Sequence, residues 1–200
     1  YPNHLAAEAV EEVWRRFAEA LLPLDSAGKL GAVLLQFPEW FVPSRANREY
    51  LLGAKQRLAG YRACVEFRNR SWLATDRDRD RTLGLLREHE LALVSVDMPQ
   101  GFRSSLPPVA EVTDPALSVI RFHGRDPKAW EKKTVSERFR YRYGEDELRE
   151  WVPRIEHLAE SAGQVHALLN NCYSDYAVVN ARQLMDLLSS ANADVVPPQS

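Results

Sequence analysis

The sequence has few cysteines and no long apolar run, and each absence excludes a class of protein. There are two cysteines among 200 residues, Cys64 and Cys172, whereas a small secreted domain built on disulfides would carry more. Both lie in or beside apolar segments, which indicates buried thiols, a reducing compartment and a cytoplasmic location. No apolar run approaches the roughly 20 residues that cross a bilayer, and no signal peptide opens the chain. We therefore expect no membrane partner.

Motifs of several common enzyme classes are missing too. The sequence contains no GxGxxG, Walker loop, HExxH, GxSxG or zinc-type cysteine pairing, which argues against nucleotide-dependent dehydrogenases, P-loop enzymes and common hydrolases. Basic residues number 26 and acidic residues 28, so the charge of the whole molecule favours neither nucleic acid nor an anionic membrane. Any basic site must therefore be local. The sequence implies no particular cofactor and leaves the oligomeric state open.

The sequence does contain a repeated alternation of short apolar runs and amphipathic segments. Hydrophobic residues make up 45% and charged residues 27%, as in a globular domain. Apolar residues at helical spacing predict a first helix at 4–22 that ends at Pro23. Short apolar runs predict five strands, at 31–37, 61–67, 91–97, 117–123 and 164–170. We expect the other helices at 45–59 with Ser44 as N-cap, from 76–81 through LGLLREHE, at 145–162 and at 175–189, with loops at 98–116 and 124–144.

The repeat of strand and helix predicts a parallel sheet. Polar residues end the five predicted strands at intervals of 30, 31, 26 and 47 residues, and a strand–helix unit takes roughly 30 residues. These strand ends are Gln36, Glu66, Asp97, His123 and Asn170. Each helix must return the chain to the same end of the sheet, so all strands run in one direction.

Alternation within the strands favours a TIM-type (β/α)8 barrel over the other candidate, a doubly wound open sheet. We assign a uniformly apolar set of alternate positions to the face under the helices, whereas the intervening positions become polar towards each strand end. Helices cover both faces of an open sheet but only the outer face of a barrel, whose inner face opens into a polar mouth. The apolar set is Val33, Leu35, Phe37, Ala63, Val65, Phe67, Ala92, Val94, Val96, Ile120 and Phe122, and the polar-ended set is Leu34, Gln36, Arg62, Cys64, Glu66, Arg68, Ser95, Asp97, Arg121, His123, His166 and Asn170.

Five strands are too few for a barrel of eight, which typically needs about 250 residues. We therefore expect residues 1–200 to be a single partial barrel domain made of its C-terminal five units, with three strand–helix units missing before residue 1. The presence of Tyr rather than Met at position 1 agrees with this expectation.

Three polar side chains end successive strands and are candidates for catalysis. Glu66, Asp97 and His123 would meet at one mouth, where they serve acid–base chemistry or, as an alternative, hold a divalent metal. Arg68 and Arg121 point to the same mouth, and their positive charge disfavours a cation there. The structural alternative is a salt-bridge network that satisfies buried charges.

Arginines and aromatic residues gather in the loops beyond the strand ends. The arginines suit bidentate recognition of a carboxylate or phosphate. Together with the aromatic rings they suit an anionic ligand that contains a ring, such as a nucleotide or a single strand, unless the rings simply pack under the loops. The residues are Arg68, Arg70, Arg121, Arg125, Trp72, Trp130, Tyr141, Tyr143 and Tyr173. Asn170 and Asn171 either hydrogen-bond a substrate or cap the last helix, for which Ser174 is another candidate.

Six segments at the strand ends form a recognisable series: LLQFPEWF (34–41), VEFRNRSWL (65–73), SVDMP (95–99), VIRFHGR (119–125), YRYGEDEL (141–148) and LLNNCYSDYAVVNA (168–181). In this order they resemble the domain-of-unknown-function 72 family, the YecE-like proteins. The resemblance covers nearly the whole chain and implies a TIM-type barrel whose full-length members begin with a Gly-Thr-Ser-Gly-Trp-like strand, absent here. It implies no cofactor, and the family has no settled activity. Its motif positions fall on Gln36, Pro38, Glu66, Phe67, Arg68, Trp72, Asp97, Arg121, His123, Gly124, Tyr143, Asn170 and Asn171, while Asn69 stands where the family commonly has His.

Three hypotheses on function follow. The first is an enzyme of hydrolase or lyase type acting on a small anionic substrate, with Glu66 or Asp97 as general base, His123 as acid or electrophile, and Arg68 and Arg121 as anion clamps. Its further ligand contacts are Gln36, Trp72, Tyr143, Asn170 and Asn171. The second is a nucleic-acid-binding or nuclease-like barrel, in which the basic stretch 121–142 follows the backbone and Trp72, Tyr141 and Tyr143 stack bases. The third is a non-catalytic scaffold whose polar mouth is structural.

Overall fold

Five parallel strands form one curled sheet. The computed structural model describes residues 5–130 and 139–191. Every strand pairs in parallel with the strand before it in sequence. The predicted α/β class and parallel order are confirmed, and the sheet is a curled half-barrel; within the described residues no closed barrel is formed. The strands are β1 (Val33–Gln36), β2 (Ala63–Glu66), β3 (Ala92–Asp97), β4 (Ser118–Phe122) and β5 (Val165–Leu169).

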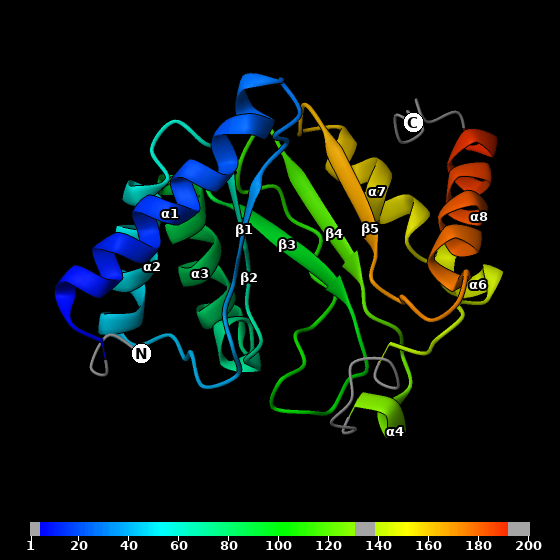
Figure 1. The fold of residues 1–200 in the computed structure, drawn as a ribbon. Helices are drawn as coiled ribbons and strands as arrows, with labels where there is room; N and C mark the ends of the chain where they lie inside the picture. Colours follow the sequence, from blue (N-terminus) through cyan, green and yellow to red (C-terminus); the bar gives the residue numbers. More distant parts are fainter. Residues whose placement is uncertain (1–4, 131–138, 192–200) are drawn as a thin grey trace.

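The longer helices lie along the outer side of the sheet, whereas the short helix α4 (Pro127–Trp130) lies beyond the C-terminal strand ends (Figure 1). The other described helices are α1 (Ala7–Ser26), α2 (Arg45–Arg57), the 3-10 helix η2 (Arg70–Trp72), α3 (Asp76–Glu88), α6 (Glu145–Arg149), α7 (Val152–Ala159) and α8 (Tyr176–Ser190). Figure 1 shows α1, α2 and α3 on the β1 side of the sheet and α6, α7 and α8 on the β5 side. The predicted N-cap Ser44 is confirmed, since its hydroxyl accepts a hydrogen bond from the Asn47 amide. Among the described helices, none is long and apolar enough to cross a membrane.

Two helix predictions are wrong, and proline explains both. Helix α1 continues through Pro23 to Ser26, because proline removes one hydrogen bond on an exposed helix whose next turn still forms, with the Ala27 amide donating to the Pro23 carbonyl. The helix predicted at 145–162 is split into α6 and α7. Pro153 has no amide to continue α6, but it is tolerated in the first turn of α7. The loop predicted at 124–144 contains α4, and its part 131–138 lies outside the described residues.

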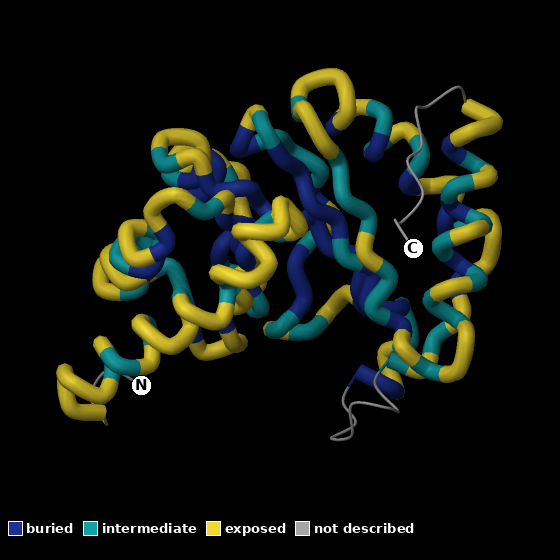
Figure 2. The backbone as a smooth tube through the Cα atoms, turned by 45° about the horizontal axis from the view of Figure 1, so that its top comes forward, coloured by how far each residue is buried: buried dark blue, intermediate teal, exposed yellow. Residues whose placement is uncertain are grey.

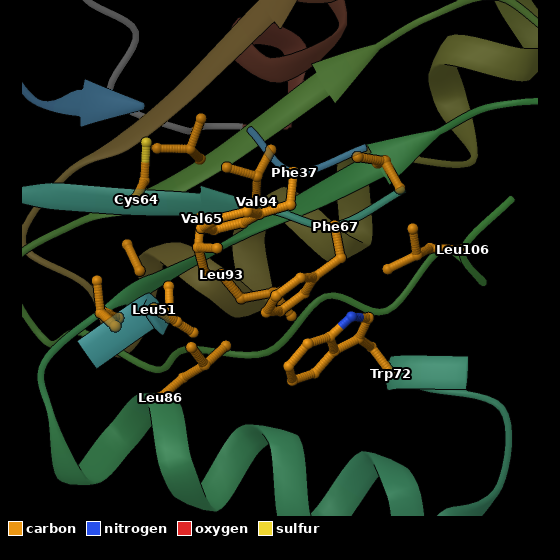
Figure 3. Close-up of a cluster of buried hydrophobic side chains, with 14 of the residues drawn as sticks. Phe37, Leu51, Cys64, Val65, Phe67, Trp72, Leu86, Leu93, Val94 and Leu106 are labelled. Carbon is orange, nitrogen blue, oxygen red and sulfur yellow. The ribbon is translucent and has the colours of Figure 1, made fainter. Parts of the chain in front are cut away.

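The apolar core lies between the sheet and its helices. Figure 2 shows the central strands buried and the outer turns of the helices exposed. In the part under α2 and α3, the rings of Phe67 and Trp72 stack at 4.1 Å, and Figure 3 shows them beside Leu86 of α3. The indole of Trp72 donates a 2.6 Å hydrogen bond to the Phe41 carbonyl, so its one polar group is satisfied inside the core.

The register of the sheet assigns each side chain to a face. Paired residues share a face, and Gln36 pairs with Glu66 while Val96 pairs with Arg121. Asp97 pairs with Phe122, a residue of the helix-facing core. The prediction that Ser95 and Asp97 share the inner face with Glu66 is therefore wrong, and Ala92, Val94 and Val96 take that face. Strand β3 is buried on both faces, so its hydrophobic pattern has no alternation from which the inner face can be read.

The inner, concave face closes at one end and opens at the other. A Cβ atom placed on Gly31, just before β1, would lie 3.5 Å from Cε1 of His166 in β5. The edge strands thus approach each other where they begin, and Figure 1 shows them diverging towards their C-terminal ends. The open end is where the polar strand ends lie.

Candidate functional site

Glu66 is the centre of a cluster at the open end of the concave face. Its carboxylate is completely buried and contacts the side chains of two arginines and one histidine. Oε1 lies 2.6 Å from Nε of Arg68 and 3.1 Å from Nε2 of His123, and Oε2 lies 2.5 Å from Nη1 of Arg121. A buried carboxylate needs such partners, because burial without them would cost several kcal/mol.

Asn170 closes this cluster into a ring of hydrogen bonds. Its side-chain oxygen accepts from Nη2 of Arg121 at 3.1 Å, and its side-chain nitrogen lies 3.1 Å from Nδ1 of His123. With the amide in this orientation Nδ1 accepts, so a neutral imidazole carries its proton on Nε2 and donates it to Glu66. Nη2 of Arg68 lies 3.2 Å from the same Nε2 and, in this tautomer, contacts it without donating a hydrogen bond to it. Gln36 joins from β1, where its oxygen accepts from Nη1 of Arg121 at 2.9 Å. We call Gln36, Glu66, Arg68, Arg121, His123 and Asn170 the concave cluster.

The charges of the concave cluster are fixed by burial and by the arginines. Burial disfavours a charge on Glu66, but the hydrogen bond from His123 and the charges of Arg68 and Arg121 outweigh it and lower the pKa of Glu66 to about 2. Burial lowers the pKa of His123 to about 4, although its hydrogen bond to Glu66 acts in the opposite direction. At neutral pH the pair is therefore a carboxylate and a neutral imidazole.

Aromatic rings wall one side of the concave cluster. The ring of His123 lies 5.9 Å from that of Phe139 and 6.3 Å from that of Trp130. The guanidinium of Arg68 lies over the Trp130 ring at 5.5 Å, a cation–π contact. Trp130 itself is held by a hydrogen bond from its indole to Ser104. The loops after β3 and β4 thus keep water from part of the site.

Asp97 belongs to a different network, behind the sheet. Its carboxylate accepts hydrogen bonds from the Tyr143 hydroxyl at 2.7 Å, from the Trp151 indole at 2.6 Å and from Nη2 of Arg125 at 2.7 Å. Arg125 also reaches Glu150, at 2.9 Å. Asp97 thus lies with the residues under α6 and α7, on the face opposite to Glu66 and His123.

Three further predicted ligand contacts lie away from the concave cluster. Trp72 has an exposed fraction of 0% and Tyr143 of 2%, so neither ring presents a surface to a ligand. Asn171 is buried too, and its amide donates to the Tyr141 carbonyl and to Asn180. It does not cap the last helix, because α8 begins at Tyr176 after Asp175. Of the predicted site residues, the concave face brings six together.

Two important residues were missed by the sequence analysis. Trp151 binds Asp97, and nothing in its sequence surroundings distinguishes it. Asn180 binds both the amide and the carbonyl of Tyr143, each at 3.0 Å. Asn180 lies four residues before Leu184 and eight before Leu188, the buried face of α8, so helical spacing was a usable signal for a buried polar residue.

The two cysteines differ in their surroundings. Cys64 is buried on the concave side of β2, and Cys172 is exposed, so the prediction of two buried thiols holds for Cys64 and is wrong for Cys172. Burial, and then the charge of Glu66, raise the pKa of Cys64 to about 12. Within the described residues, no three His, Cys, Asp or Glu side chains gather as a metal site.

The fold and the concave cluster together define a class: a parallel α/β half-barrel with an arginine–carboxylate–histidine cluster at its strand ends. The family model described as "Protein of unknown function DUF72" matches residues 3–200. The chain belongs to the DUF72 family, and the predicted resemblance is confirmed.

A curated relative and solved structures agree with this membership. The curated UPF0759 protein YunF of Bacillus subtilis (strain 168) is 31% identical over 197 residues, which are 96% of this chain and 70% of that protein. A crystal structure of a DUF72 family protein from Enterococcus faecalis V583 has a TM-score of 0.84 and 29% identity, over 98% of this chain and 72% of that one. A second, from Thermotoga maritima MSB8, has a TM-score of 0.80 and 32% identity, over 89% of this chain and 65% of that one.

Proposed function

We propose that the chain binds a small anion, a carboxylate or phosphate group, on the concave face at Arg121 and Arg68. The observation that carries this proposal is the orientation of Arg121. Its guanidinium is held by Glu66, Gln36 and Asn170 from three different strand ends. A guanidinium fixed in this way is ready to form bidentate hydrogen bonds without further loss of side-chain freedom.

Arg121 also keeps donors for a ligand. A guanidinium has five N–H donors, and the bonds of Arg121 to described residues use Nη1 twice and Nη2 once. The side chain of Arg121 is 14% exposed and that of Arg68 is 13% exposed. Both side chains therefore border the open end of the concave face. The aromatic wall of Trp130 and Phe139 lowers the local dielectric, which strengthens attraction between these cations and an anion.

The proton affinities of the cluster support binding more than acid–base chemistry. A carboxylate with a pKa of about 2 is a weak proton acceptor at neutral pH. Both imidazole nitrogens of His123 already have partners, Glu66 and Asn170. The nucleic-acid hypothesis has less support, because Trp72 and Tyr143 are buried and have no face on which a base can stack. We therefore limit the proposal to recognition of an anion.

The test is titration calorimetry with inorganic phosphate and with acetate at fixed ionic strength. We expect saturable binding to the native chain and at least tenfold weaker binding to Arg121→Gln, because a charge-assisted hydrogen bond contributes about 1.5–3 kcal/mol. Arg149→Gln is the matched control: it removes the same charge from an exposed ion pair with Glu145 on α6, and binding should be unchanged. Absence of binding by either anion, or equal binding by Arg121→Gln, would refute the proposal.

A further inference from the structure

Asp97 and its partner Tyr143 hold three consecutive residues that begin with His123. The amide of His123 donates to the Asp97 carbonyl at 2.8 Å. The amide of Gly124 donates to the Tyr143 hydroxyl at 2.7 Å, and this hydroxyl donates onward to Oδ1 of Asp97, also at 2.7 Å. The side chain of Arg125 then forms a fork on the Asp97 carboxylate. The main-chain carbonyl of Asp97 thus holds His123, and its buried carboxylate holds Gly124, through Tyr143, and Arg125.

The chain needs this support because it turns sharply after His123. Gly124 has a φ of +88°, and a Cβ atom there would lie 2.6 Å from Cβ of Tyr141. The backbone therefore bends against Tyr141, and the Gly124 amide points into the protein. Without the Tyr143 hydroxyl this buried amide would have no acceptor among the described residues, which is unfavourable enough to move the turn.

We propose that Asp97 and Tyr143 are positioning residues that act through the sheet and hold His123 in its hydrogen bonds to Glu66 and Asn170. One part of this inference, that the site positioned in this way binds an anion, rests on the proposed function. It replaces a role of Asp97 as general base, because its carboxylate faces away from the concave cluster and already accepts from Tyr143, Trp151 and Arg125. The sheet therefore separates the ligand face from the network that shapes it.

The test compares Tyr143→Phe with Tyr141→Phe. The first variant removes the hydroxyl between Gly124 and Asp97 but keeps the ring that packs on Phe122. The second removes a neighbouring hydroxyl, whose partner is Glu147. The readout is the imidazole signal of His123 in nitrogen-15 NMR spectra, which reports both its tautomer and its titration. The charged groups that act on His123 are Glu66, Arg68 and Arg121.

In Tyr143→Phe we expect loss of the single Nε2–H tautomer and a rise of the His123 pKa by about one unit or more, because the ring leaves its buried place. Tyr141→Phe should keep the native signal. Trp151→Phe removes another hydrogen bond to Asp97 and should shift the His123 signal in the same direction. It replaces Tyr143→Phe in the experiment if that variant does not fold. A lower melting temperature with an unchanged His123 signal in both variants would overturn the inference.

Phosphate titration separates this inference from the proposed function. If native protein binds phosphate, Tyr143→Phe should bind it several-fold more weakly and Tyr141→Phe equally well. If no variant binds phosphate but the His123 signal changes as expected, the positioning stands and the proposed function fails. If the native protein binds phosphate and Tyr143→Phe binds it with the same affinity, this result would count against the inference.

Discussion

The buried, neutral state of His123 makes stability depend on pH in a defined window. The pKa of His123 is lowered from 6.5 to about 4 in the folded chain. When the pH falls below 6.5, the unfolded chain takes up a proton that the folded chain does not, so the free energy of unfolding decreases until the pH reaches about 4. Each pH unit of this window corresponds to about 1.4 kcal/mol, so we expect a loss of roughly 2–3 kcal/mol between about pH 7 and pH 4.5.

The assay is urea unfolding followed by tryptophan fluorescence at several pH values above about 4.5, where the contribution of Glu66 is still complete. Glu66 has its pKa lowered from 4.5 to about 2, so its stabilisation is present above pH 4.5 and is lost only as the pH falls towards 2. The quantity to compare is the slope of unfolding free energy against pH, in the native chain and in His123→Gln. We expect the variant to lose the share of the slope that comes from His123.

The control is His157→Gln. His157 lies on α7 in an exposed pair with Glu160, at 3.6 Å, so its removal should leave the slope nearly unchanged. The reasoning is refuted if His123→Gln retains the native slope. It is also refuted if NMR shows His123 titrating near 6.5 in the folded chain, because the burial argument would then have the wrong magnitude.

The further predictions concern two glycines and the two cysteines. Gly124→Ala should destabilise the chain by about 2–4 kcal/mol, because Gly124 has a left-handed backbone and the new Cβ atom would clash with Tyr141. Gly53→Ala within α2 should stabilise it by about 0.5–1 kcal/mol, because nothing lies within 4 Å of the new Cβ atom. Equal melting temperatures of the two variants would contradict these predictions. Iodoacetamide should modify the exposed Cys172 in the native chain and spare the buried Cys64. The pKa of Cys64 is raised to about 12, first by burial and second by the charge of Glu66, so its thiol is unreactive. Comparable labelling of the two cysteines in a peptide mass spectrum would contradict the burial of Cys64.

The order and direction of the strands could be predicted from the sequence because each strand is a short apolar run between turn signals. That signal concerns single segments and their spacing, which is also why the predicted bounds are wider than the observed ones: the strand predicted at 31–37 is Val33–Gln36. The break of the helix at 145–162 depends on Pro153, which the apolar periodicity alone does not weigh.

The candidate site was predictable where a strand has one polar and one apolar face. Glu66, Arg121 and His123 follow that rule and meet as expected. Asp97 does not, because β3 is apolar on both faces and a polar residue at its end can turn either way. Its direction is decided by the partners Arg125, Tyr143 and Trp151, which come from 28, 46 and 54 residues further along the chain. Tertiary contacts of this kind have no local sequence signal.

The sequential order of the strands in the sheet also bears on how the chain acquires its structure. Each strand hydrogen-bonds the one synthesised just before it, so the sheet can grow in the order of translation without waiting for a distant segment. The connection from β4 (Ser118–Phe122) to β5 (Val165–Leu169) is about twice as long as the one from β3 (Ala92–Asp97) to β4. Because a doubling of loop length adds only about 0.6 kcal/mol to the entropic cost of closure, this cost differs little from one unit to the next. A nascent chain leaving the ribosome could therefore add β2 to β1, then β3, β4 and β5, with each new helix covering fresh apolar surface as it emerges.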